Sequence, residues 1–180
     1  MKTLQTRWIC RSFLFKMKFL EKDLEQIIFE TENDLLNERG LDISGLKKRQ
    51  LRIGNYGIAD LVTVQKTYDY YNKVIPELNI TIFELKKNEI SINTFLQSIR
   101  YLKGIKSYLN NRKSYYNVNY KIVLIGDSID KNSDFIFLTD LIDSNRYGTS
   151  FSLEFYTYDF DFNGITFNSQ SGYQLTNEGF

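Results

Sequence analysis

The chain has 180 residues, of which 42% are hydrophobic and 25% charged, with a net charge of +1 at pH 7. This length and composition are typical of one globular domain, and the near-neutral charge excludes a surface that is basic all over. The absence of histidine and the single cysteine exclude histidine-dependent triads, histidine metal sites, cysteine metal clusters and internal disulfides. Hydrolytic chemistry would therefore depend on carboxylates, lysine, tyrosine and a hard cation such as Mg²⁺.

The chain begins with a basic N-terminal extension, residues 1–16, which carries no acidic residue. It lacks the long apolar core and the small-residue cleavage site of a signal peptide. We interpret it either as a genuine basic arm or as an added or misassigned start, because Met17 opens the new phrase MKFLEKDLEQII. No apolar run is long enough to cross a bilayer, and residues 17–180 are predicted to form a single cytoplasmic domain.

The first predicted helix runs from Phe19 to about Asn37. Its apolar residues recur at helical spacing, and Gly40 is expected to end it. On a helical wheel, three glutamates fall on one flank of the apolar stripe: Glu21, Glu25 and Glu32. We expect these side chains to lie at the border between core and solvent.

A glycine turn and a strand follow this helix. Gly54 and Gly57 bracket a tight turn within Gln50–Val64, and Ile58–Val64 has the composition of a strand. A basic cluster closely precedes Asp60. These side chains are candidates either for guiding a phosphate backbone to a site or for ordinary solvation: Lys47, Lys48, Arg49 and Arg52.

The strongest strand signal is Asn79–Lys86, NITIFELK, where β-branched and aromatic residues dominate. Ile92–Leu109 then predicts a helix, and the short apolar run Lys121–Gly126 predicts a strand that is buried on both faces. Strands separated by helices indicate an α/β fold with a layered sheet.

The last third of the chain has weaker signals. Phe135–Ile142 is ambiguous, with a preference for helix. Ser152–Phe160 and Gly164–Phe167 predict a terminal hairpin.

The predicted strands and helix determine which polar side chains can lie close together. Side chains alternate along a strand, so Glu84 and Lys86 project to the same side while Leu85 points the other way. Gln97 and Tyr101 are four positions apart and share one face of the following helix. If the strands that hold Asp60 and Glu84 pair antiparallel, the two carboxylates can meet at one point.

Two carboxylates at one point predict a metal site, because like charges that close repel strongly unless a cation lies between them. Asp60, Glu84 and the backbone carbonyl of Leu85 supply the oxygen ligands that Mg²⁺ or Mn²⁺ prefers. Such a metal polarises a phosphate oxygen and lowers the pKa of a bound water. Lys86 can orient that water and offset the charge that develops on the phosphate. The sequence therefore predicts phosphodiester hydrolysis without histidine.

The runs GIADLV and ITIFELKK resemble the motifs of the PD-(D/E)xK nuclease superfamily, with Asp60 as the acid and Glu84-x-Lys86 as the ExK signature. Ala59 stands where the motif name has proline. The run QSIRY is similar to the QxxxY motif of the RecB-like branch, which assigns Gln97 and Tyr101 to the site.

The opening EKDLEQII resembles the first helix of the NucS-like and related members, which often supplies another carboxylate, here best matched by Glu25. The resemblance covers about Phe19–Ile105. It implies a restriction-endonuclease-like mixed β-sheet flanked by helices, a divalent metal, and cleavage most often of DNA.

Several of these residues keep an alternative interpretation. Glu25 and Gln97 are also compatible with exposed helix faces, and Tyr101 with packing under the site rather than contact with substrate. Lys87, next to Lys86, is either a phosphate contact or a solubilising surface residue.

The predicted function is a metal-dependent DNA endonuclease in repair, restriction or defence, with RNA as the less favoured substrate. A homodimer or a protein partner is expected to supply specificity, because the net charge is low. The alternative is a catalytically silent nuclease-fold module that binds nucleic acid or a protein partner. A structural domain with a chance ExK motif is the third reading.

Overall fold

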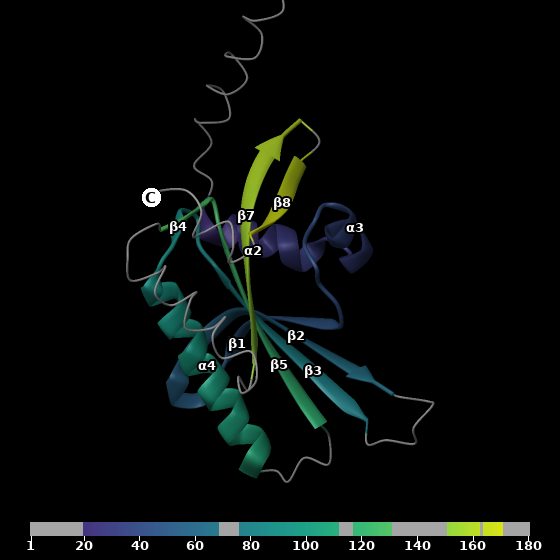
Figure 1. Ribbon diagram of the computed structural model, residues 1–180, viewed down its shortest axis with the longest axis vertical. Coiled ribbons are helices and arrows are strands. Elements are labelled where there is room, and N and C mark those ends of the chain that lie inside the picture. The colour runs from purple at the N-terminus through teal and green to yellow at the C-terminus, as the bar shows by residue number, and fades with distance from the viewer. Residues whose placement is uncertain (1–19, 69–75, 112–116, 131–150, 163, 171–180) are drawn as a thin grey trace, which may run out of the picture.

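The computed structural model describes residues 20–68, 76–111, 117–130, 151–162 and 164–170. Its centre is a mixed six-stranded sheet in the order β1-β2-β3-β5-β7-β8, flanked by helices (Figure 1). The predicted α/β class is therefore confirmed. Both the N-terminal extension and the ambiguous segment Phe135–Ile142 lie outside the described residues.

The strands of this sheet are β1 (Leu46–Arg52), β2 (Ile58–Thr67), β3 (Glu77–Leu85), β5 (Asn117–Gly126), β7 (Ser152–Asp161) and β8 (Gly164–Gln170). The helices are α2 (Glu21–Glu30), α3 (Asn33–Glu38) and α4 (Ile92–Asn111), with a 3₁₀ turn, η1 (Gly54–Tyr56). A separate small ribbon pairs β4 (Glu89–Ile90) with β6 (Ser128–Ile129). Among the described residues, no helix has the length and apolar character needed to span a membrane.

The order of pairing brings the sequence motifs to one end of the sheet. β1, β2 and β3 form an antiparallel meander, so the condition under which Asp60 and Glu84 can meet at one point is fulfilled. α4 connects β3 to the parallel strand β5, and β7 pairs parallel to β5. The predicted terminal hairpin is also confirmed, as β7 and β8.

The two faces of the sheet have separate cores because strand side chains alternate. Leu61 and Phe83 pack towards α2 and α3, whereas Val62 and Ile82 pack towards α4 (Figure 1). The run Ile122–Ile125 of β5 contributes to both cores and is fully buried, as the sequence predicts.

The first predicted helix, Phe19 to about Asn37, is wrong in its length, because its described part is divided between two helices, α2 and α3. The chain is extended at Thr31 and Glu32, which separate α2 from α3. Lys47 from β1 explains the break: its Nζ donates hydrogen bonds to the carbonyls of Ile28, at 3.0 Å, and Thr31. These bonds satisfy carbonyls at the end of α2 that a continuing helix would use itself.

Gly40 ends α3 as predicted. Its φ of 91° is the left-handed conformation that glycine adopts most readily. The N–H of Leu41 then donates a hydrogen bond to the carbonyl of Leu36 at 2.9 Å, as in the Schellman motif that ends many helices. This turn brings both leucines into the core on the α2 face.

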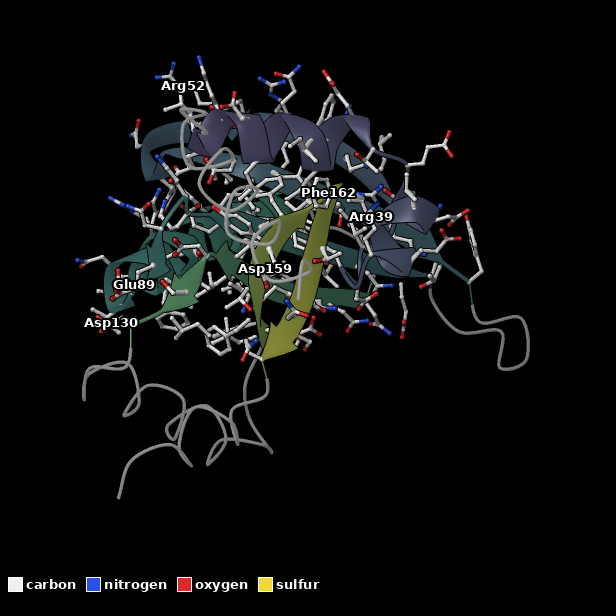
Figure 2. All side chains as sticks on the ribbon, turned by 90° about the horizontal axis from the view of Figure 1, so that it is seen from above. Arg39, Arg52, Glu89, Asp130, Asp159 and Phe162 are labelled. Carbon is white, nitrogen blue, oxygen red and sulfur yellow. The ribbon has the colours of Figure 1, made fainter. Side chains whose placement is uncertain are left out.

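The β7–β8 hairpin is attached to the end of α3. Arg39 donates from Nη1 to the carbonyl of Ile165 at 3.2 Å, and its own carbonyl accepts from the N–H of Phe167 at 2.8 Å. Figure 2 shows Arg39 beside the β7–β8 hairpin. The hairpin is therefore fixed to the helical layer as well as to the sheet.

Candidate active site

Asp60 and Glu84 lie where β2 and β3 part. The antiparallel register ends at the pair Leu61–Phe83, and the next rung, Asp60 with Glu84, is missing from the ladder of these described strands. The Asp60 side chain fills the gap, because its Oδ2 accepts a hydrogen bond from the backbone N–H of Leu85 at 3.0 Å. At this point the Asp60 carboxylate replaces the backbone pairing between β2 and β3.

Glu84 is fully buried at the end of β3. Its Oε1 accepts a hydrogen bond from Nζ of Lys86 at 2.8 Å, which fits the prediction that both side chains project to the same side. Its Oε2 is buried and has no hydrogen-bond partner among the described residues. A buried carboxylate oxygen without a partner is costly, so this atom needs either a proton or a cation.

Leu85, between them, is fully buried in the core on the α2 face. Its side chain therefore points away from the Glu84–Lys86 pair, as strand alternation requires.

The N-terminus of α2 closes one side of the site. Oε1 of Glu21 lies 3.7 Å from Nζ of Lys86, and Oε2 accepts from the backbone N–H of Lys87 at 3.4 Å. Glu21 lies on the flank of the helix that the sequence predicts to border the core, whereas the resemblance to the nuclease family assigns Glu25 to the site. The two glutamates are four positions apart and share a helix face, so the spacing could have indicated both.

The first half of α4 closes the other side. Nε2 of Gln97 donates to the phenol oxygen of Tyr101 at 2.7 Å, so the QxxxY pair is joined along the helix. Tyr101 is buried and packs against the glycine turn, where a Cβ on Gly57 would lie 2.8 Å from the tyrosine ring. Burial, with smaller contributions from the charges of Glu84 and Asp60, raises the pKa of Tyr101. The phenol therefore stays protonated as a hydrogen-bonding group next to both carboxylates.

Burial changes the protonation of the two carboxyls. It raises the pKa of Asp60 to about 6, although the Leu85 N–H and the charge of Lys86 oppose this. Burial and the neighbouring charge of Asp60 raise the pKa of Glu84 to about 7, again against Lys86. For Lys86, burial lowers the pKa, but the charge and hydrogen bond of Glu84 outweigh it and the net direction is upward.

The oxygen atoms of the site can supply some, but not all, of the ligands of a divalent cation. The described residues contain no group of three or more aspartate, glutamate, histidine or cysteine side chains arranged to hold a metal ion. The site offers two carboxylates, and one of their oxygens, Oε2 of Glu84, is buried without a partner. A hard cation is held by such oxygens, with backbone carbonyls and water completing its shell. The residues present therefore fit a cation that keeps several water ligands, as Mg²⁺ does.

The basic cluster before Asp60 forms most of β1, a strand that the sequence analysis did not predict. Lys47 caps α2, as described above, and Arg49 pairs with Glu25. Lys48, Arg52 and Lys87 are exposed, and Figure 2 shows Arg52 projecting from the molecule. Two of the predicted phosphate contacts, Lys47 and Arg49, therefore have protein partners, and the other three are exposed.

Metal-free protein should become less stable as pH rises towards neutrality. The pKa values of Asp60 and Glu84, about 6 and about 7, lie above their ordinary values of 3.8 and 4.5. Between these limits the folded chain binds more protons than the unfolded chain, so the free energy of unfolding falls as pH increases. Urea unfolding in a metal chelator at about pH 5 and about pH 8 measures this decrease.

The matched control is the double variant Asp60→Asn/Glu84→Gln, which removes both titrating groups. Its stability should depend less on pH than that of the parent chain, and saturating Mn²⁺ should stabilise only the parent at the higher pH. Equal pH dependence in the two proteins would contradict the assignment of the shift to this pair.

Comparisons of the chain with protein-family models, curated proteins and solved structures gave no match.

Proposed function

We propose that this chain is a metal-dependent nuclease that hydrolyses phosphodiester bonds, with DNA as its substrate. The observation that carries the proposal is Oε2 of Glu84, which is buried with no hydrogen-bond partner in the described part of the chain, next to Asp60 and to a lysine that contacts the same carboxylate at 2.8 Å. Two carboxylates and a lysine at the end of a splayed strand pair form a suitable set of groups for phosphoryl chemistry without histidine.

The arrangement of elements supports the proposal. The resemblance to the PD-(D/E)xK nucleases implies a mixed sheet between helices, and the chain has a mixed sheet with α2 on one face and α4 on the other. The three motif segments, in β2, at the end of β3 and in α4, meet at one end of this sheet. We therefore propose a restriction-endonuclease-like fold.

Asp60, Glu84 and the backbone carbonyl of Leu85 would hold the cation, Mg²⁺ or Mn²⁺. When bound, such a cation supplies Lewis-acid polarisation of a phosphate oxygen and a water of lowered pKa. Two features of the chain orient these ligands. The backbone N–H of Leu85 donates a hydrogen bond that fixes the orientation of Asp60, and complete burial restricts the side chain of Glu84.

Lys86 contributes in two ways. Its ammonium neutralises the Glu84 carboxylate in the metal-free chain, where the two atoms are hydrogen-bonded. During hydrolysis its positive charge offsets the negative charge that develops on the phosphate oxygens, and one N–H can orient the attacking water. Contact with Glu21 at 3.7 Å keeps the ammonium at this end of the sheet.

Gln97 and Tyr101 act as positioning residues. The Gln97 amide fixes the phenol of Tyr101, which is buried beside the two carboxylates. Tyr101 packs closely on Gly57, so this pair holds α4 against the glycine turn. The exposed cations Lys48, Arg52 and Lys87 would contact phosphates away from the reaction centre.

A panel of labelled nucleic acids tests the proposal. Single- and double-stranded DNA and RNA are incubated with the chain in Mg²⁺, in Mn²⁺ and in a chelator. We expect cleavage of at least one DNA substrate that requires the metal. Metal-independent binding of nucleic acid with no cleavage under any condition would contradict the enzymatic function and favour the catalytically silent nucleic-acid-binding module.

A further inference from the structure

Glu25 is a second buried carboxylate next to the site. It lies on α2, its exposed fraction is 5%, and it contacts Gln50, the residue of β1 that stands opposite Asp60 in the β1–β2 register. Both of its oxygens face cationic or amide groups of β1. Oε1 is 2.5 Å from Nε of Arg49, and Oε2 accepts a short hydrogen bond from Nε2 of Gln50.

The contact between Arg49 and Glu25 is an ion pair without hydrogen-bond alignment. Oε1 of Glu25 is buried and lacks a hydrogen-bond partner among the described residues, although the guanidinium is near. Only two buried carboxylates of the described chain carry such an oxygen, Glu25 and Glu84, and both lie beside Asp60. Oε1 of Glu25 is neutralised by the Arg49 guanidinium, so it becomes available to a cation once that ion pair opens.

Gln50 is held in an unusual backbone conformation at this point. Its φ is 50°, the one positive value among the described non-glycine residues. The ladder between β1 and β2 pairs Arg49 with Leu61 and Leu51 with Ala59, and it omits the rung between Gln50 and Asp60. A left-handed residue other than glycine is strained and persists where surrounding contacts require it. Here the strained residue stands beside Asp60 and directs its amide to Glu25.

We infer that Arg49 and Gln50 form a clamp that holds Glu25 away from the cation of the Asp60–Glu84 pair and so lowers the metal affinity of the site. This inference rests on the proposed function. Release of the clamp makes Glu25 a third carboxylate for the cation. Affinity for hard cations increases with the number of charged oxygen ligands.

The clamp also gives Arg49 a role towards substrate. Its side chain is 37% exposed, so an approaching phosphate can reach the guanidinium that now contacts Glu25. The planar guanidinium of arginine can donate two parallel hydrogen bonds to phosphate oxygens, so arginine binds phosphate well. A phosphate that binds Arg49 frees Glu25, so substrate binding and metal binding strengthen each other by the same factor.

Calorimetric titration of Mn²⁺ into metal-free protein tests the clamp without measuring turnover. Arg49→Gln removes the ion pair and should tighten Mn²⁺ binding on the order of tenfold. Lys22→Gln is the charge-matched control, since it removes one exposed positive charge from α2. A gain in Lys22→Gln equal to that in Arg49→Gln would show a general charge effect and overturn the inference, as would unchanged or weaker binding by Arg49→Gln.

Two further variants keep the test decisive if Arg49→Gln folds poorly. Gln50→Gly removes the amide donor and suits a positive φ, so it should fold and should also bind Mn²⁺ more tightly than the parent. Arg49→Gln/Glu25→Gln leaves no unpaired buried charge and should bind no more tightly than Glu25→Gln alone. Unchanged affinity in Gln50→Gly, or a gain that persists without Glu25, contradicts the clamp.

The outcomes separate this inference from the proposed function. A parent chain that binds no Mn²⁺, with no binding by any variant, contradicts both. Mn²⁺ binding by the parent that requires Asp60, combined with no effect of Arg49→Gln and Gln50→Gly, contradicts the clamp and leaves the proposed function in place.

Discussion

Asp60→Asn is expected to reduce metal-dependent cleavage on the order of 10³-fold or more. Asparagine has nearly the same size and can still accept the hydrogen bond of the Leu85 N–H, so the end of the sheet should keep its structure. The variant lacks the negative charge that holds the cation with Glu84. Metal-ion stabilisation of the transition state is worth several kcal/mol, and about 4 kcal/mol corresponds to this rate factor.

Initial rates of cleavage in saturating Mg²⁺ measure the effect, with urea unfolding to verify the fold. Asp34→Asn is the control, because Asp34 lies exposed on α3, at a different part of the molecule. It should cleave at the rate of the parent. Comparable activity in Asp60→Asn and Asp34→Asn would remove Asp60 from the site.

Lys86→Met should lose about 10²–10³-fold in cleavage rate while it still binds the metal. Its ammonium stabilises charge that appears only as the phosphate reacts, so its removal affects turnover more than substrate binding. Methionine keeps the apolar stem of the lysine in its partly buried position. The Glu84 carboxylate then loses its hydrogen-bond donor among the described residues and a positive charge that lowers its pKa, so metal binding is compared at about pH 8 or above, where Glu84 is most readily ionised.

The matched control is Lys103→Met on the exposed side of α4, which makes the same change far from Glu84. It should leave both the cleavage rate and Mn²⁺ affinity unchanged. A Lys86→Met protein that cleaves as fast as the parent would contradict the role of this lysine, and one that no longer binds Mn²⁺ would show that it stabilises the site instead of the reaction.

Local patterns predicted the elements that carry most of the candidate site. The strand before Lys86 and the helix Ile92–Leu109 have unambiguous periodicity, so their bounds came close to β3 and α4. Strand alternation then predicted that Glu84 and Lys86 would project together, and helical spacing predicted that Gln97 and Tyr101 would share a face. These relations depend on residues near one another in the chain.

Relations between distant segments could not be predicted in this way. β1 has the sequence LKKRQLR, with neither a strand alternation nor an apolar run, because its side chains serve α2: Lys47 caps the helix and Arg49 pairs with Glu25. The same capping ends α2 at a point where its own periodicity continues. The positive φ of Gln50 arises from these long-range contacts, and glutamine gives no local signal for it.

The most direct test of the account is calorimetric titration of Mn²⁺ into the metal-free parent chain and into Asp60→Asn, at about pH 8, where the raised pKa of Glu84 leaves it ionised. The account predicts a saturable site in the parent that Asp60→Asn lacks. Equal binding by the two proteins, or no binding by the parent, would contradict a metal centre at Asp60 and Glu84.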